Sequence, residues 1–419
     1  MSPEPVVLDV TEFGAVGDGV ANDGTAVLAH ACFEDFDGFR TIRPRFDPDV
    51  GAVLYFPAGT YRLGPIDGYD RSHSFPFSRF HIRGDGPGVT TVVLDHVAYP
   101  KVRLSIHGDP RFGGGVDTSI TNLTVASNLP DPGDRDSADM NIHLRDLHGF
   151  VAHDVEVCNG PRIGFHVNSC SDLTFRDLDV HDMCTDGIHL VGCQRVTIED
   201  CRCADTGDDA IAIWGGNWWN PEQSADVVVR RNTIERAGSN GIALGGCERV
   251  VVEDNTVRGT YLTGIGIRPM DGYGPVSDVT IRANRIDDAG FHETGILWGG
   301  GIASGIAVAD DLHTGMPIER VTVLDNVIGR CRNNFVRIKG VSEVTVAGNR
   351  WVGPLVEGAS ANQGSGQGSS NVDPLSYEAV YVADSTDVTV TAPARPRWRR
   401  VAGRARRAAR TALRPADGA

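Results

Sequence analysis

The sequence has 419 residues, of which 41% are hydrophobic and 22% charged, and it contains 51 Gly and 22 Pro. This composition excludes a disordered or collagen-like chain. The net charge of −16 is unevenly distributed, because residues 395–419 hold nine Arg and one Asp and so leave −24 for the first 394 residues. An acidic body repels nucleic-acid phosphates, so we expect no nucleic-acid partner for it.

Targeting signals are not evident. No run approaches 18 apolar residues, and the start MSPEPVVLDV lacks a charged segment followed by an apolar one, so we expect neither a transmembrane segment nor a secretion signal. Nine cysteines, an odd number, do not indicate a disulfide framework. We therefore expect a cytoplasmic protein, with secretion as the open alternative, and a basic tail at 395–419 that is a solvated arm suited to an anionic surface.

The N-terminal segment VTEFGAVGDGVANDGTAVLAHACFEDF predicts a strand, a Gly-rich turn and an amphipathic helix over about residues 20–36. Asn22 or Asp23 is the expected N-cap. Such a helix can close the open end of a repetitive core, and VLYFPAGTYRLGP would then begin the repeats.

A short phrase of alternating β-formers recurs from about residue 172, as in VTIEDC, VVVEDN and VTVLDN. A second phrase, Gly-Ile-x-Ile or a close relative, follows each copy, so each unit of about 23 residues predicts two short strands and no helix. Five copies of the first phrase end in Asn, which predicts a ladder of Asn232, Asn255, Asn284, Asn326 and Asn349, because Asn tolerates left-handed turns and its amide can bond to the next coil.

Strands that repeat in constant order predict an all-β fold, a parallel β-solenoid over residues 1–394, with a loop in the low-complexity stretch 357–375. A β-propeller or a β-sandwich is the alternative, but 23 residues are too few for a four-stranded propeller blade. The expected interior column contains Ile188, Ile211, Ile242 and Ile265. Cys193, Cys201, Cys203 and Cys247 are expected to fill the core.

Two sequence segments resemble known proteins. FGAVGDGVANDGTAV followed by VLYFPAGTYRL resembles the opening of the pectate-lyase superfamily, and CTDGIHLVGCQRVTIEDCRCADTGDDAIAI resembles the Asp motifs of glycoside hydrolase family 28, the polygalacturonases. The resemblance covers most of residues 7 to 350. It implies a single-stranded right-handed parallel β-helix and an inverting glycosidase acting on an oligo- or polysaccharide, with uronic acids as one candidate sugar.

Three carboxyl groups are the candidate catalytic residues. Asp186 and Asp209 occupy the same place in successive coils, and Asp208 is adjacent. Like-charge repulsion should raise at least one pKa, which places an acid beside a base. By resemblance, Asp208 is the general acid, while Asp186 and Asp209 activate water. A purely structural interpretation, in which these Asp residues only form turns, is the alternative.

The candidate substrate-binding residues surround this cluster. The resemblance places Asn240 where the family has His, and Arg268 where it has Lys. A literal Arg-Ile-Lys occurs at residues 337–339, but coils about 4.8 Å apart put it roughly 20 Å from Asp209. His189 lies on the outward face beside the acids, and Trp214, Trp218 and Trp219 are candidate sugar-stacking residues.

Two other functions are compatible with a β-helix that carries stacked carboxylates. A β-helix lyase or epimerase would use stacked carboxylates to bind Ca²⁺, whereas the hydrolase needs no cofactor. A glycan-binding β-helix without catalysis is the non-enzyme alternative, and the replacement of the family's His by Asn240 supports it.

Overall fold

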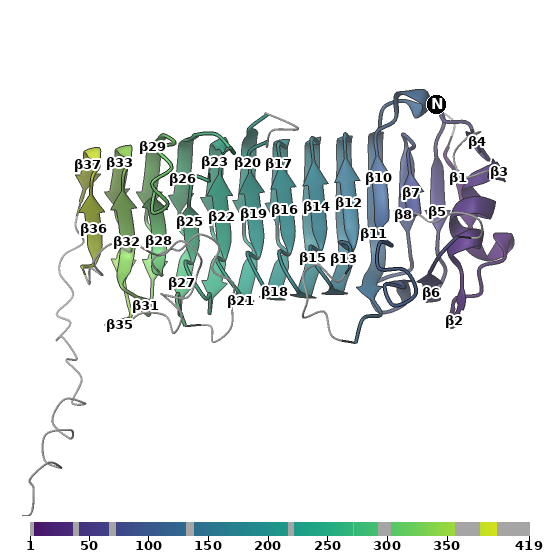
Figure 1. The fold of residues 1–419 in the computed structure, drawn as a ribbon, viewed down its shortest axis with the longest axis horizontal. Coiled ribbons are helices and arrows are strands. Elements are labelled where there is room, and N and C mark those ends of the chain that lie inside the picture. The colour runs from purple at the N-terminus through teal and green to yellow at the C-terminus, as the bar shows by residue number, and fades with distance from the viewer. Residues whose placement is uncertain are drawn as a thin grey trace, which may run out of the picture.

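The computed structural model describes residues 4–36, 42–66, 73–130, 138–216, 222–270, 272–291, 303–356 and 378–391. These residues form a parallel β-helix whose coils stack in chain order from the N-terminal end to β36 and β37 (Figure 1). The predicted all-β solenoid is confirmed. The expected loop at 357–375 and the basic tail at 395–419 lie outside the described residues.

One face of the β-helix is an 11-stranded parallel sheet to which each coil contributes one strand. In spatial order its strands are β7 (His73–Phe75), β10 (Leu104–His107), β12 (Ile142–Arg145), β14 (Phe165–Asn168), β16 (Ile188–Val191), β19 (Ile211–Trp214), β22 (Ile242–Gly245), β25 (Ile265–Ile267), β28 (Ser304–Ala309), β32 (Asn334–Lys339) and β36 (Val380–Ala383). The Gly-Ile-x-Ile phrases supply these strands, so the second predicted strand of each unit lies here.

The remaining faces belong to one 22-stranded sheet. Its strands are β1 (Val6–Asp9), β2 (Asp18–Asn22), β5 (Ala52–Tyr55), β6 (Gly59–Leu63), β8 (Phe80–Arg83), β9 (Thr90–Leu94), β11 (Val116–Ser127), β13 (His148–Gly160), β15 (Ser171–Met183), β17 (Gln194–Glu199), β18 (Arg202–Thr206), β20 (Ser224–Arg230), β21 (Thr233–Ala237), β23 (Cys247–Glu253), β24 (Thr256–Arg258), β26 (Val276–Arg282), β27 (Arg285–Asp287), β29 (Ile318–Leu324), β30 (Val327–Ile328), β33 (Ser342–Ala347), β34 (Arg350–Trp351) and β37 (Thr386–Val390).

A typical coil therefore has three strands, such as β19, β20 and β21, where the sequence predicted two. The missed strand follows the ladder Asn. In β21 it buries only Ile234 and Ala237, so its alternating pattern is too short to recognise.

The predicted Asn ladder is confirmed. The backbone N–H of Asn232 donates to Asn255 Oδ1 over 2.9 Å, and the same bond links Asn255 to Asn284, Asn284 to Asn326, and Asn326 to Asn349. The expectation that the ladder Asn residues themselves adopt the left-handed conformation is wrong. The residue before each Asn takes the left-handed conformation, as Arg231 does with φ of 56°, so the Asn itself is selected for its amide.

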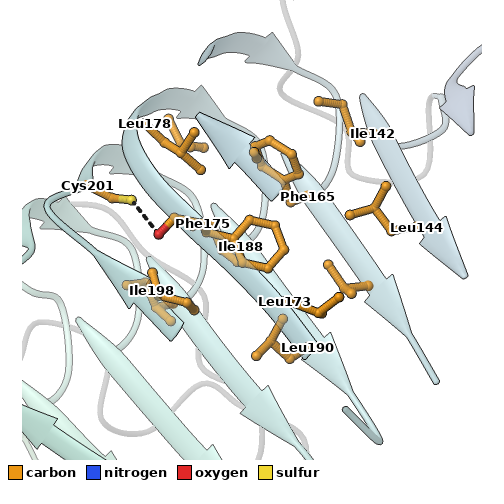
Figure 2. Packing of buried hydrophobic residues seen from close by; sticks show 14 of the residues in the cluster. Ile142, Leu144, Phe165, Leu173, Phe175, Leu178, Ile188, Leu190, Ile198 and Cys201 are labelled. Carbon is orange, nitrogen blue, oxygen red and sulfur yellow. Dashed lines mark hydrogen bonds between the residues drawn. The ribbon is translucent and has the colours of Figure 1, made fainter. Parts of the chain in front are cut away.

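Apolar side chains from both sheets fill the interior (Figure 2). Ile188, Ile211, Ile242 and Ile265 are fully buried in one column. Cys193, Cys201, Cys203 and Cys247 are buried as predicted. Cys201 Sγ points toward the carbonyl of Phe175 in Figure 2, so the thiols act as small core residues.

The N-terminal end differs from the prediction of a helix over about residues 20–36. It contains β2, a six-residue π-helical turn η2 (Thr25–His30), and a strand β3 (Phe33–Phe36) paired antiparallel with β4 (Ile42–Pro44). Asn22 Oδ1 accepts the N–H of both Gly24 and Gly64 and so ties this segment to a neighbouring coil instead of starting a long helix. The long capping helix is not confirmed, although η2 buries Val27 and Leu28 in the core.

Other short elements complete the chain: 3₁₀ turns η1 (Val10–Phe13) and η3 (Pro110–Phe112), and a small sheet of β31 (Cys331–Arg332) and β35 (Leu355–Val356). Across the described ranges, no helical segment combines the length and the apolar character needed to span a bilayer.

Candidate functional site

The candidate site lies where the chain turns into β16, β19 and β22. The N–H of Gly187 donates to the carbonyl of Asp209, and the N–H of Ala210 donates to that of Asn240, each over 3.1 Å. Asp186, Asp209 and Asn240 therefore occupy one column in successive coils, as the sequence predicted. Parallel stacking places their side chains over one another.

The three acids form a compact buried cluster. One carboxylate oxygen from each of Asp186, Asp208 and Asp209 lies within 4.8 Å of the other two. The N–H of Asp209 donates to Asp186 Oδ1 over 3.0 Å, and Asp209 Oδ1 accepts both the N–H and the Nδ2 group of Asn240 at 2.8 Å. The bonds resemble those of the Asn ladder, but their direction is reversed, because here the N–H of the later coil donates to the side chain of the earlier coil.

The electrostatics of this cluster favour retention of a proton. Burial and the nearby Asp186 carboxylate raise the pKa of Asp209 to about 6, although the hydrogen bonds from Asn240 and the charge of Arg268 oppose the shift. A carboxyl group that titrates near neutral pH beside other carboxylates can exchange protons with a substrate.

His189 extends the cluster along the outward face. Its Nδ1 lies 2.7 Å from Asp186 Oδ2, so an ionised Asp186 holds the Nδ1–H tautomer and leaves Nε2 for another partner. His166 and His143 follow in the same column on β14 and β12. Burial lowers the pKa of His143 to about 4 and that of His166 well below its usual value, so both rings are neutral at pH 7.

A cavity of about 170 Å³ opens above the cluster. Small residues form part of its surroundings, since Ala212, Ala243 and Gly266 continue the column of His189 in successive strands. The lining residues are Asp186, His189, Asp208, Asp209, Trp214, Ser239, Asn240, Arg268, Met270 and Tyr273. The structure therefore brings together seven of the nine predicted site residues.

Aromatic side chains form one wall of the cavity. The rings of Trp214 and Tyr273 lie 5.4 Å apart between centroids. A Cβ atom on Gly245 would come within 2.2 Å of the Trp214 ring, so that ring lies directly over Gly245. Trp218 and Trp219 lie outside the described residues.

Polar groups complete the cavity. Arg268 directly follows β25, and its N–H donates to the carbonyl of Leu244. Asn240 Oδ1 is buried without a hydrogen-bond donor among the described residues. A Cβ atom on Gly266 would lie 3.2 Å from this oxygen, so a glycine there keeps the space beside it open. A ligand hydroxyl is a suitable donor for this oxygen.

The literal Arg-Ile-Lys segment is not part of the cavity lining. Arg337 lies two strands beyond Gly266 in the same column, separated from it by Ala307. Its guanidinium pairs with Asp311 at 2.6 Å and lies over the Tyr381 ring. Arg337 therefore contacts groups on another part of the same face.

Sequence reasoning missed Met270 and Tyr273 as lining residues. Both lie between β25 and β26, where the chain departs from the repeat and carries no periodic signal. Ser239 occupies the same place in its coil as Asp208 does in the preceding coil, and its N–H donates to the Asp208 carbonyl. Aligning the two repeats in the sequence would therefore have predicted Ser239 as a lining residue.

Comparisons with known proteins agree with the fold. Residues 163–351 match the family model described as a right handed beta helix region. Mannuronan C5-epimerase AlgE1 of Azotobacter vinelandii is 26% identical over 202 residues, 43% of this chain and 12% of that protein. The uncharacterized protein YclG of Bacillus subtilis (strain 168) is 33% identical over 276 residues, 64% of this chain and 38% of that protein. The chain thus spans much less than the full length of either relative.

Solved structures show the same architecture over most of the chain. The family 28 exopolygalacturonase of Yersinia enterocolitica has a TM-score of 0.63 at 15% identity and covers 94% of this chain and 80% of its own. The A-module of mannuronan C-5 epimerase AlgE6 of Azotobacter vinelandii has a TM-score of 0.58 at 17% identity, with 92% and 100% covered. The GH87 α-1,3-glucanase of Streptomyces thermodiastaticus has a TM-score of 0.54 at 16% identity, with 93% and 69% covered. The chain is a right-handed parallel β-helix protein.

Proposed function

We propose that this protein is a carbohydrate-active enzyme that hydrolyses glycosidic bonds in an oligo- or polysaccharide at Asp186, Asp208 and Asp209. The observation that carries the proposal is the buried cluster of three carboxyl groups, one of which has a pKa raised to about 6, at the bottom of a cavity. Glycoside hydrolysis needs a protonated carboxyl for the leaving oxygen and a carboxylate to act on water or on the sugar. The names of the structural neighbours, which include two glycoside hydrolases, agree with this reaction class.

The roles within the cluster follow from the resemblance of the Asp motifs to those of family 28, while the raised pKa of Asp209 indicates that the cluster as a whole can hold a proton near pH 6. We assign the general acid to Asp208, and water activation to Asp186 and Asp209. The nearest cluster oxygens lie within 4.8 Å, whereas inverting pairs usually stand about 6.5–9.5 Å apart. The proposal of an inverting mechanism therefore rests on the resemblance of the Asp motifs to those of family 28 and not on the distance between the carboxyl groups. Proton NMR of the anomer that is released first tests it.

The cavity walls suit a sugar. Trp214 and Tyr273 offer apolar ring surface, Arg268 offers a cation for a carboxylate or paired hydroxyls, and Asn240 offers an acceptor. A uronic acid is the sugar class that would use the Arg268 cation best.

The deciding experiment compares the wild type with Asp208→Asn on a panel of polysaccharides, with products identified by mass spectrometry. We expect the variant to lose cleavage by about 10²- to 10⁴-fold, because one acid–base catalyst is removed. Unchanged cleavage by a correctly folded variant would contradict the assignment. Binding without turnover across the panel would favour a non-catalytic glycan-binding protein.

A second prediction concerns the aromatic wall. Trp214→Ala should weaken binding of the cleaved glycan by up to about tenfold, because a ring contact contributes about 0.5–1.5 kcal/mol. Trp214→Phe is the matched control, since it keeps an aromatic ring over Gly245. Calorimetric titration of the glycan into variants that also carry Asp208→Asn measures binding without turnover. Equal affinity for the Ala and Phe forms would remove Trp214 from the binding site.

Elimination or C5 epimerisation of a uronate is the second candidate function. The Asp186–His189 pair at 2.7 Å favours it, because an imidazole oriented by a carboxylate can act as a general base toward the proton beside the uronate carboxylate. Arg268 would neutralise that carboxylate, and Tyr273 would give a proton to C5 in epimerisation or to the leaving oxygen in elimination. An unsaturated product with ultraviolet absorbance, or an altered sugar configuration, lost in His189→Gln would identify this reaction.

A bound Ca²⁺ ion would be needed only for the second candidate function, elimination or C5 epimerisation. Asp186, Asp208 and Asp209 would hold the ion and it would stabilise the substrate carboxylate. Ca²⁺ usually takes six to eight oxygens, and Asp209 Oδ1 already accepts two N–H groups. The described residues thus fit Ca²⁺ poorly, and we propose no resident cofactor for the hydrolase. Inhibition by a chelator would contradict this.

A further inference from the structure

A second group of chemically versatile side chains lies on the outer face of the 22-stranded sheet. Glu156 and Cys158 are on β13, and His181 is on β15 in the next coil. Cys158 and His181 are direct register partners, and Glu156 is two residues before Cys158 on the same face. Val155, Val157 and Val180 alternate with them and point into the core. Parallel pairing therefore brings the three functional groups together.

The distances in this group match those of a metal site. His181 Nε2 lies 3.2 Å from Glu156 Oε1. Two ligands at about 2.0–2.1 Å from one tetrahedral Zn²⁺ would stand about 3.3 Å apart. One ligand atom from each of Glu156, Cys158 and His181 lies within 4.8 Å of the others, so the thiol is also within reach.

Further contacts orient these ligands. Asp182 Oδ2 lies 2.6 Å from His181 Nδ1, which leaves Nε2 directed toward Glu156. Thr124 Oγ1 donates to Glu156 Oε2 over 2.6 Å, and the N–H of Gly88 donates to Thr124 Oγ1. A carboxylate behind a ligating His, and a hydrogen bond behind a ligating carboxylate, are the usual supports of metal ligands.

The donor set selects the metal. Thiolate, imidazole and carboxylate suit Zn²⁺, whereas Ca²⁺ and Mg²⁺ prefer oxygen alone. The group of His153, Asp154 and Asp177 offers no thiolate. The side chains of Glu156 and His181 are 29% and 22% exposed, so an ion reaches them from solvent.

We propose that Glu156, Cys158 and His181 bind one Zn²⁺ ion, with solvent in the fourth position. On binding, the Cys158 thiol loses its proton to solvent, and Sγ, Nε2 and Oε1 become ligands. The ion ties β13 to β15, the strand whose end leads into Asp186. Its role is therefore to stabilise the coils that carry the catalytic cluster.

The test uses the full-length protein, stripped with a chelator and dialysed against Zn²⁺ or Co²⁺. We expect one equivalent of Zn²⁺ per chain, and a thiolate-to-Co²⁺ charge-transfer band that is absent in Cys158→Ser and in His181→Gln. Asp182→Asn should weaken binding by about 10- to 100-fold, because it removes the support behind His181. The charge-transfer band separates this site from the three-Asp cluster, which has no sulfur.

Two controls make the result specific. Cys184→Ser alters the partly exposed cysteine beside Asp186, and His153→Ala alters the neighbouring His group; both should keep the band and the stoichiometry. Circular dichroism confirms that each variant is folded. Absence of stoichiometric Zn²⁺ binding by the wild type would show an ion pair alone between His181 and Glu156, and a band retained in Cys158→Ser would equally overturn the proposal.

Discussion

Asp209→Asn is expected to raise the melting temperature of this protein at pH 7 while lowering its glycan cleavage by about 10²-fold or more. Asparagine keeps the Oδ1 atom that accepts two hydrogen bonds from Asn240. It removes a negative charge that is buried beside Asp186. The variant would thus pair two amides as Asn232 and Asn255 do, with the direction reversed, and would lose the titrating group.

The direction of the pH dependence follows from the raised pKa. An unfolded Asp titrates near 3.8 and the folded Asp209 near 6, so the folded state binds more protons between these values. Stability of the wild type therefore falls as pH rises through this window. The cost at pH 7 is on the order of 1–3 kcal/mol, and Asp209→Asn does not incur it. The two proteins should converge in stability near pH 4.

Asp226→Asn is the matched control for this effect. The Asp226 carboxylate is exposed, and its hydrogen bonds with Arg249 lower its pKa. Replacing it should slightly reduce stability at pH 7, the opposite sign. Thermal melts of the three proteins at pH 4 and pH 7 give the comparison. If the melting temperature of Asp209→Asn at pH 7 is equal to or below that of the wild type, the buried Asp209 charge does not destabilise the folded protein and the prediction is wrong.

Asn255→Ala is expected to cause the largest loss of stability. Asn255 Oδ1 accepts both the N–H and the Nδ2 group of Asn232, and Asn255 Nδ2 donates to the carbonyl of Val229 and to Asn284 Oδ1. Alanine removes these four bonds, at about 1 kcal/mol each, and it leaves the buried N–H of Asn232 without its acceptor, which costs about 1–3 kcal/mol. Asn232 Nδ2 keeps its bond to the carbonyl of Ile198, and Asn284 Oδ1 keeps the backbone N–H of residue 255. A total of roughly 3–6 kcal/mol is large against a typical stability of 5–15 kcal/mol.

Thr256→Ala provides the comparison, because Thr256 is the next residue and is exposed. Denaturant unfolding should separate the two variants clearly. Amide hydrogen exchange should show lost protection at Asn232 in Asn255→Ala, since that N–H loses its acceptor. Equal unfolding free energies for the two variants would show that the ladder contributes little.

Repetition explains why so much was predictable. The column relations of Asp186 with Asp209, and of His166 with His189, follow from counting residues within a repeat, and the structure has both. The Asn ladder followed in the same way. An error of one residue in the assumed repeat length would have assigned every side chain to the wrong column. Agreement between the predicted and observed columns across several coils is therefore a demanding test.

The remaining features depend on contacts that do not repeat. Tyr273 reaches Trp214 from a segment outside the periodic pattern, so no column predicts it. The turn around Asn22 is held by Gly64, 42 residues away, which a local helix pattern does not reveal. The raised pKa of Asp209 could be expected in direction from clustering, but its size depends on burial in the folded coil.

The ladder also bears on how this scaffold can be engineered. Asn284 and Asn326 are 42 residues apart in sequence, yet they bond as closely as Asn232 and Asn255, which are 23 apart. Coil register is therefore insensitive to the length of the intervening chain. Met270 and Tyr273 lie in such a connection, between β25 and β26. Libraries that vary these connections could change what the cavity accepts while the stacked coils stay in place.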